Sequence, residues 1–85
     1  MKNIMVTGGA GFIGSAFVRH IVNTYPDFNI IVYDKLTYAG NLDNLLPVSD
    51  APNYRFERGD IADREGVRSV YQTHDIDTVV NFAAE

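Results

Sequence analysis

The stretch "TGGAGFIG", from Thr7 to Gly14, decides the fold of this chain. It follows a short apolar run, "KNIMVT" (Lys2 to Thr7), which reads as a strand. Beyond it, apolar residues recur with helical spacing from Gly11 to about Thr24. A glycine motif between a predicted strand and a predicted helix is typical of a turn that binds the diphosphate of a dinucleotide.

Each glycine of this motif has its own expected role. Gly8 permits the tight turn, Gly11 lets a diphosphate approach the backbone, and Gly14 allows the helix to pack closely on the strand. The free N–H groups of Phe12 and Ile13, at the positive end of the helix dipole, are then expected to face the phosphates. An ordinary glycine-rich turn between strand and helix is the alternative.

A second candidate for binding the dinucleotide is Asp34. It lies 20 positions after Gly14 and directly after a second apolar strand, Asn29 to Tyr33. A carboxylate there can accept hydrogen bonds from both adenosine ribose hydroxyls and repel a 2′-phosphate, which favours NAD over NADP. Because Lys35 is adjacent, that preference is not absolute, although Gly9 and Ala10 offer no side chain to a 2′-phosphate. The alternative is an aspartate that only caps the next turn.

The third and fourth strands end in two further motifs. Tyr54 to Arg58 alternates aromatic and charged residues, which suits a strand at or near a sheet edge. In the following "GDI" (Gly59 to Ile61), Asp60 can accept from the adenine amino group while Ile61 packs on the ring, or Asp60 is only a turn residue. After the fourth strand, Thr78 to Phe82, the small Ala83 and Ala84 leave room for a flat cofactor or serve only packing.

The segments between these strands are less regular. Residues 35 to 52 are predicted to be irregular, with a helical turn near Leu42 to Leu46 that Pro47 ends. A second full helix is expected after Asp63, which can cap it. Its apolar face carries four residues with helical spacing: Val67, Val70, Tyr71 and His74.

Strands that alternate with helices predict βαβ units and a parallel sheet. We therefore expect an α/β fold, a truncated NAD-binding Rossmann fold with four parallel strands in the order 3-2-1-4. The apolar fourth strand lacks a fifth neighbour in this chain. Residues 1–85 are thus expected to form the N-terminal part of a dinucleotide-binding domain, without a substrate domain. An exposed apolar strand edge favours pairing with another chain, so self-association through Thr78 to Phe82 is predicted.

Composition excludes several classes of function. The chain has 85 residues, no cysteine and a formal net charge of −4 at pH 7. Disulfides, thiolate metal sites and cysteine nucleophiles are therefore excluded. The negative charge argues against nucleic acid, whose binding proteins normally carry a basic face. No apolar run approaches the roughly 20 residues that span a bilayer, and no secretory leader is recognisable. We expect a cytoplasmic protein without a membrane partner.

No side chains are grouped in a way that indicates catalysis or metal binding. His20 and His74 fall close to the apolar faces of their helices and are interpreted as surface or half-buried residues. No metal-ligand spacing is present, and no serine, histidine and acid set suggests a nucleophile.

Taken together, "TGGAGFIG", Asp34, "GDI" and "NFAAE" resemble the motifs of the extended short-chain dehydrogenase/reductase family, whose first motif is TGxxGxxG. The stretch "DKLTYAGNLDNL" (Asp34 to Leu45) is narrower, and is similar to the segment after the second strand in the dTDP-glucose 4,6-dehydratases. The resemblance covers the whole chain but only the beginning of a family member.

The resemblance implies a set of cofactor-binding residues. They lie in the diphosphate turn, in the ribose and adenine loop, at the adenine contact and under the nicotinamide side of NAD. In chain order they are Gly8, Gly11, Phe12, Ile13, Gly14, Asp34, Lys35, Leu36, Thr37, Asp60, Ile61, Phe82, Ala83, Ala84 and Glu85.

The resemblance also implies an activity. The family uses tightly held NAD to oxidise the sugar at C4, eliminates water across C5 and C6, and returns the hydride to C6. The implied substrate is dTDP-glucose and the product dTDP-4-keto-6-deoxyglucose. The family's active-site tyrosine and lysine (YxxxK), its threonine and its acid/base carboxylates fall downstream of Glu85. No catalytic residue is therefore assigned, and the chain alone is expected to be inactive.

Two other functions stay open at this point. One is a non-catalytic module that holds NAD or a similar nucleotide without turnover. The other is the corresponding part of a UDP-sugar epimerase of the same superfamily, against which "LTYAGNLDNL" argues.

Overall fold

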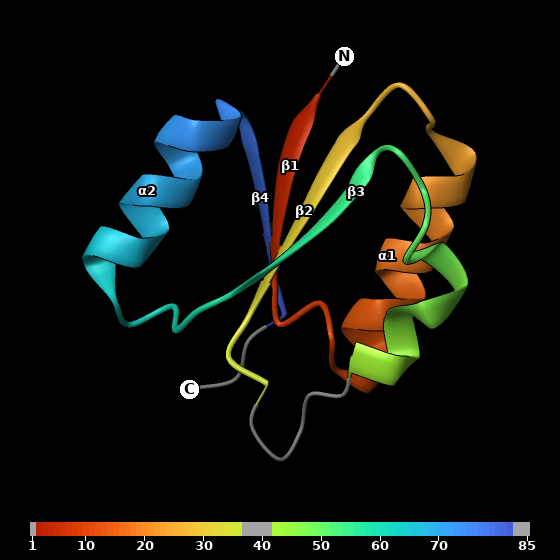
Figure 1. The fold of residues 1–85 in the computed structure, drawn as a ribbon, viewed down its shortest axis with the longest axis horizontal. Helices are drawn as coiled ribbons and strands as arrows, with labels where there is room; N and C mark the ends of the chain where they lie inside the picture. Colours follow the sequence, from red (N-terminus) through yellow and green to blue (C-terminus); the bar gives the residue numbers. More distant parts are fainter. Residues whose placement is uncertain (1, 37–41, 83–85) are drawn as a thin grey trace.

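The computed structural model describes residues 2–36 and 42–82. In chain order the elements are β1 (Asn3–Thr7), α1 (Phe12–Thr24), β2 (Asn29–Asp34), η1 (Leu42–Val48), β3 (Tyr54–Arg58), α2 (Arg64–His74) and β4 (Thr78–Asn81). The strands described form one parallel sheet in the order β3-β2-β1-β4 (Figure 1). The predicted α/β fold with strand order 3-2-1-4 is confirmed.

β1 and β2 form the centre of this sheet. Their pairing runs in register from Asn3 opposite Asn29 to Thr7 opposite Tyr33. Apart from their first residues, Asn3 and Asn29, both strands are buried along their whole length. Strands covered on both faces need apolar residues at every position, which explains the unbroken apolar runs in the sequence.

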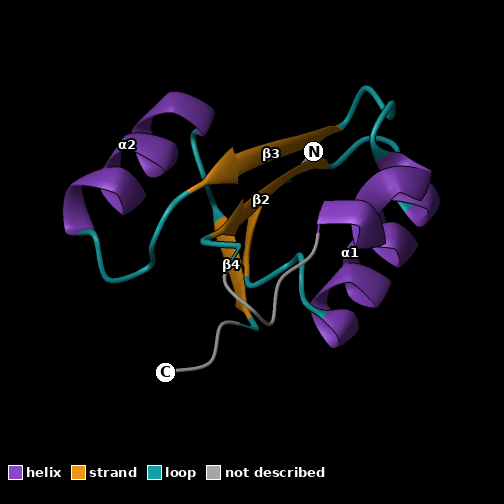
Figure 2. Ribbon diagram, turned by 60° about the horizontal axis from the view of Figure 1, so that its bottom comes forward, coloured by secondary structure: helices purple, strands orange, loops and turns teal. Residues whose placement is uncertain are grey.

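Helices cover the two faces of the sheet unequally. α1 and η1 lie on one face and α2 on the other (Figures 1 and 2). The core under α1 and η1 contains Ile4, Val6, Ala10, Val18, Ile21, Val22, Ile30, Val32, Leu45 and Val48. The core under α2 contains only Met5, Ile31, Tyr33 and Val70. Neither α1 nor α2, the α-helices of the described ranges, is long and apolar enough to cross a bilayer.

α1 ends at Thr24 because the next residue precedes a proline. Tyr25 has left the helical region, with φ −123° and ψ 75°, as expected for a residue before Pro26. The Asn53 side-chain amide then donates to the carbonyls of Val22 and Tyr25, each over 3.3 Å. These bonds satisfy carbonyls that the end of a helix leaves without an intrahelical partner.

The connection between β2 and β3 contains more helix than the sequence predicts. Pro47 does not end a turn at Leu46; it lies inside the 3₁₀ helix η1, so that prediction is wrong. Proline disrupts an α-helix by clashing with the carbonyl four residues earlier and by losing that hydrogen bond. Pro47 has no N–H to donate in a 3₁₀ helix either, but the carbonyl of Asn44, three residues earlier, accepts instead from Arg19 over 2.8 Å. Leu45 and Val48 are buried in the core under α1.

α2 starts after Asp63 as predicted, but the cap differs. Asp63 occupies the N-cap position, yet its side chain makes no capping hydrogen bond. One carboxylate oxygen lies 3.0 Å from the place where a Cβ on Gly66 would be. The carboxylate is therefore beside the first turn without the geometry of a cap, and the prediction holds for the position but not for the bond.

The apolar face of α2 is narrower than predicted. Val70 is buried, whereas Val67 and His74 are half-buried. Tyr71 is 42% exposed, so its predicted place on the buried face is wrong. The reason is that α2 contacts the sheet mainly through the small cluster around Tyr33, which leaves its flank uncovered.

β3 is an edge strand of the described sheet, as its alternation predicts. Tyr54 and Phe56 are half-buried against the core under α1, and Arg55 is exposed. Glu57 is half-buried because it pairs with His74 of α2 over 2.5 Å. The prediction that His74 is a half-buried residue is confirmed, and its partner is now known.

Candidate functional site

The turn after β1 depends on one left-handed residue. Gly8 has φ 74°, a conformation that a side chain would make costly. Its N–H donates to the carbonyl of Tyr33 over 3.1 Å, and its carbonyl accepts from the N–H of Gly11 over 3.2 Å. The tight turn predicted at Gly8 is therefore present.

Two glycines let α1 approach the sheet. A Cβ on Gly14 would collide with the carbonyl oxygen of Gly8, which is the close packing predicted for Gly14. A Cβ on Gly9 would lie 2.8 Å from Val32 Cγ1 and 3.2 Å from Val18 Cγ2. Sequence reasoning missed this role of Gly9, because nothing in the spacing shows that Val32 of β2 lies under the turn.

The N-terminus of α1 presents unused hydrogen-bond donors. Gly11 is the N-cap residue and its carbonyl accepts from Ser15 over 2.8 Å. The N–H groups of Phe12, Ile13 and Gly14 have no intrahelical acceptor, because the first turn of any helix lacks them. No side chain caps this end, and no acidic residue lies in the first turn. Such a helix end favours an anion.

The side chain of Asp34 bonds to the turn that leads into α1. One carboxylate oxygen accepts from the N–H of Ala10 over 2.9 Å, and the other accepts from the N–H of Leu36 over 2.8 Å. The side chain is buried with 9% exposure. The bond to Leu36 is the turn cap considered as the alternative, and the bond to Ala10 aims the carboxylate at the glycine turn. Each oxygen keeps a lone pair for a further donor.

The loop after Asp34 is held in an unusual conformation. Leu36 has φ 59°, which is the left-handed region and uncommon for a residue of its size. The preceding Lys35 is exposed and pairs with Asp60 over 3.2 Å. Thr37, also expected to contact the cofactor, lies outside the described residues.

The "GDI" segment follows β3 at the same edge. The N–H of Gly59 donates to the carbonyl of Asp34 over 3.0 Å, so the ends of β2 and β3 stay together. The Asp60 side chain accepts from the N–H of Ala62 over 2.9 Å. This bond, and then the pair with Lys35, hold the pKa of the Asp60 carboxyl below its usual value. Ile61 is 36% exposed, available for contact with a ring.

Tyr33 supports that segment from below, a role that the sequence did not reveal. Its hydroxyl donates to the carbonyl of Asp60 over 3.4 Å. A Cβ on Gly59 would collide with the Tyr33 ring, and a Cβ on Gly66 would lie 2.5 Å from its hydroxyl oxygen. Burial raises the pKa of Tyr33, and the charge of Asp63 adds to the shift. The neutral side chain of Tyr33 therefore supports the loop at Gly59 and Asp60 by packing against it and by donating to its backbone.

The end of β4 joins the same edge. The N–H of Phe82 donates to the carbonyl of Thr7 over 2.7 Å, and the Thr7 hydroxyl donates to Asn81 over 2.6 Å. The ring of Phe82 lies 5.4 Å from that of Phe17 in α1, so its side chain belongs to the apolar layer. Ala83, Ala84 and Glu85 lie outside the described residues.

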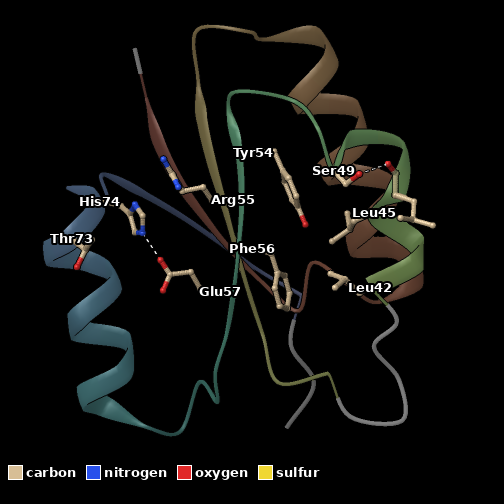
Figure 3. A pocket seen from close by; sticks show the side chains of 10 residues that line it. Leu42, Leu45, Ser49, Tyr54, Arg55, Phe56, Glu57, Thr73 and His74 are labelled. Atoms are coloured by element: carbon tan, nitrogen blue, oxygen red, sulfur yellow. Dashed lines mark hydrogen bonds and ion pairs between the residues drawn. The ribbon is translucent and has the colours of Figure 1, made fainter.

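The structure thus gathers the described candidate residues at one edge of the sheet. The carboxyl ends of parallel strands meet there, and open α/β sheets bind ligands at that edge. A separate cavity of about 810 Å³ lies beside β3, between η1 and α2 (Figure 3). None of the residues expected to bind a cofactor lines it, so the cavity is not assigned to this site. Among the described residues, no group of three or more His, Cys, Asp or Glu could hold a metal ion.

Comparison with known proteins agrees with this architecture. The family described as GDP-mannose 4,6 dehydratase matches residues 5–85. The chain belongs to this family. Its predicted membership of the extended short-chain dehydrogenase/reductase family is confirmed at the same time.

Individual members of the family are highly similar to the chain. The dTDP-glucose 4,6-dehydratase of Escherichia coli is 54% identical over 82 residues, 96% of this chain and 22% of that protein. A crystal structure of dTDP-glucose 4,6-dehydratase from Bacillus anthracis in complex with NAD matches with a TM-score of 0.97 and 48% identity. That match covers 100% of this chain and 27% of the other.

A plant enzyme is similar to the chain over nearly the whole length of the chain. A trifunctional Arabidopsis thaliana enzyme, named first as a UDP-glucose 4,6-dehydratase, is 48% identical over 84 residues, 99% of this chain. The chain spans 13% of that enzyme and 22% of the E. coli protein. Similarity to these family members therefore concerns a minor part of each.

Proposed function

We propose that this chain is the NAD-binding portion of a dTDP-glucose 4,6-dehydratase, and that residues 1–85 are the N-terminal part of its dinucleotide-binding domain. One observation carries the proposal. The N–H of Ala10, two residues before the start of α1, donates to the carboxylate of Asp34, and no side chain caps that end of α1. Similarity over 96% of the chain to the E. coli dehydratase supports it.

Different residues at this edge of the sheet would bind different parts of NAD. Phe12 and Ile13 donate their N–H groups to the diphosphate in the turn formed by Gly8, Gly11 and Gly14. Asp34 accepts from the ribose hydroxyls, and the loop of Lys35, Leu36 and Thr37 lies alongside. Asp60 and Ile61 contact the adenine. We assign Phe82, Ala83, Ala84 and Glu85 to the nicotinamide half on the family resemblance alone.

The chemistry of these donors fits NAD. A diphosphate offers only acceptors, and the first turn of α1 offers donors without an opposing acidic residue. The buried carboxylate of Asp34 has spare lone pairs for two hydroxyl donors. A 2′-phosphate beside that carboxylate would meet like charge, so NAD is favoured over NADP.

In the proposed reaction the cofactor, when bound, takes up and returns the hydride of the sugar. The described residues bind and orient it, and none is assigned to the proton transfers that oxidation at C4 also needs. The chain alone is therefore expected to produce no dTDP-4-keto-6-deoxyglucose from dTDP-glucose. Cytoplasmic location, expected from the sequence, is part of the proposal and is tested by fractionating the source cells.

Calorimetric titration of the folded chain with NAD, and with NADP as control, tests the binding function. We expect saturable binding of NAD with clear preference over NADP. Asp34→Ala should weaken NAD binding and narrow the gap to NADP, whereas Asp50→Ala, at an exposed loop residue, should change neither. A folded chain that binds neither nucleotide contradicts the proposal.

Self-association through β4 is also proposed. In the described sheet β4 pairs only with β1, and Val79 is 44% exposed, so a strand from another chain could pair with β4 at Val79. Val79→Lys should shift the chain toward the monomer in sedimentation equilibrium. Leu46→Lys, a matched change at an apolar residue of η1 with 62% exposure, should not. Monomeric behaviour of the unsubstituted chain at all concentrations contradicts this proposal.

A further inference from the structure

An ion pair joins the loops that follow β2 and β3. The Lys35 ammonium lies 3.2 Å from Oδ2 of Asp60. The backbone bond from Gly59 to the carbonyl of Asp34, 3.0 Å long, brings the two strand ends together just before this pair. The side chains of Lys35 and Asp60 are 61% and 40% exposed, so a ligand can reach both.

The carboxylate of Asp60 is well suited to hold a cation. Its Oδ1 accepts from the N–H of Ala62 over 2.9 Å, which leaves Oδ2 turned toward Lys35. The low pKa of Asp60, caused first by that backbone bond, keeps the carboxyl ionised at neutral pH. Lys35 therefore has an ionised partner within reach in the unliganded chain.

Lys35 would otherwise be a natural ligand for a 2′-phosphate. It follows Asp34 directly, and its ammonium is a compact charge on a flexible stem. An ammonium released beside Asp34 could offset the repulsion between that carboxylate and a 2′-phosphate. Arg58, the last residue of β3 and the partner of Asp34 in strand register, is a second exposed cation at this edge.

We propose that Asp60 helps to set the choice between NAD and NADP indirectly, by keeping the Lys35 ammonium paired and so unavailable to a 2′-phosphate. Asp60 acts here as a positioning residue for Lys35, in addition to any contact with adenine. The inference rests on the proposed function, since it assumes that NAD binds at this edge.

The test compares the ratio of NADP to NAD association constants among variants of the chain. Asp60→Asn keeps an oxygen for Ala62 and adenine but removes the charge that holds Lys35. Exposed ion pairs are weak, so we expect this ratio to rise by roughly twofold to fivefold. Asp27→Asn, an equal charge change at an exposed residue before β2, should leave the ratio unchanged.

A second substitution shows whether Lys35 or Arg58 causes the rise in the ratio. In a Lys35→Met chain, Asp60→Asn should raise the ratio by less than about twofold. In an Arg58→Met chain the full rise should persist. The rise seen with Lys35 present should also shrink at high salt, because it depends on an exposed charge pair. A change that only loosened the loop would not produce this dependence on Lys35.

Four results would overturn the inference. An equal rise with and without Lys35 would mean that Asp60 acts through its own charge. A rise lost in the Arg58→Met chain would transfer the role to Arg58. No rise in a chain that binds NAD normally would exclude any such effect of Asp60. If the unsubstituted chain binds neither nucleotide, the proposed function fails, and the inference fails with it.

Discussion

The carboxylate of Asp34 accepts a hydrogen bond from the backbone N–H of Ala10 over 2.9 Å. This bond joins the end of β2 to the glycine turn after β1, across 24 residues of sequence. It aims the carboxylate at the start of α1 before any ligand is present. A group already held in its bound orientation costs less to immobilise when the ligand arrives.

Asp34 should therefore matter for stability as well as for binding. Asp34→Ala leaves the N–H groups of Ala10 and Leu36 without their acceptor, and hydrogen bonds to a charged group contribute about 1.5–3 kcal/mol each. We expect the free energy of unfolding in urea to fall by roughly 2–4 kcal/mol. Asp50→Ala is the control, and equal stability of the two variants would contradict the prediction.

The two glycines at positions 9 and 11 should respond differently to alanine. Gly9→Ala places a methyl group 2.8 Å from Val32 and should destabilise the chain by about 1–3 kcal/mol. Gly11 has φ −72° and ψ 173°, which any residue adopts, so Gly11→Ala should fold normally and lose affinity for NAD. Urea unfolding and calorimetry separate the effects. A Gly11→Ala chain as unstable as Gly9→Ala would argue against this division.

The contact between Gly66 and Tyr33 predicts that Gly66→Ala has opposite effects on stability with and without the Tyr33 hydroxyl. Alanine is favoured over glycine inside a helix by about 1 kcal/mol, but a Cβ at Gly66 would lie 2.5 Å from the Tyr33 hydroxyl oxygen. Gly66→Ala should therefore destabilise the native chain and stabilise a Tyr33→Phe chain. Thermal unfolding of the four combinations measures the coupling. The same effect in both backgrounds would show that the hydroxyl does not limit position 66.

Asp77 should make stability depend on acid pH. The N–H of Asn3 donates to its carboxylate over 3.0 Å, and this bond, followed by that from the Thr78 hydroxyl, lowers its pKa. A carboxyl with a lowered folded-state pKa stabilises fully above its unfolded pKa of about 3.9 and loses this contribution as pH falls through the folded-state pKa.

The urea midpoint should accordingly decline as the pH falls below about 4. The decline should be smaller in Asp77→Asn, and Asp50→Asn serves as the control for loss of one charge. An identical acid profile in Asp77→Asn and the unsubstituted chain would show that the bond to Asn3 contributes nothing.

Patterns local in the sequence predicted most of the architecture. The apolar runs around Val6 and Val32 indicated strands covered on both faces, and the alternation around Phe56 indicated an edge. The position of Asp34 after the second strand also followed from its spacing to the glycine motif. These features depend on neighbours along one element, so the sequence carries them directly.

Features that depend on distant segments could not be predicted. The fit of Gly9 against Val32 requires the turn after β1 to cross β2, and the place of Tyr33 under Gly59 and Gly66 requires three elements to converge. Pro47 was misjudged because a proline in the sequence does not reveal which kind of helix surrounds it. In each case the structure depended on contacts between segments that are distant in the sequence.

The position of Tyr33 also gives the chain an optical reporter. The sequence contains no tryptophan, so tyrosine emission is not masked by a stronger fluorophore. Tyr33 is 4% exposed, and its hydroxyl bonds the carbonyl of Asp60. Any displacement of the loop above it changes the surroundings of this phenol. The difference in emission between the native chain and Tyr33→Phe therefore follows the adenine side of the site without an added label.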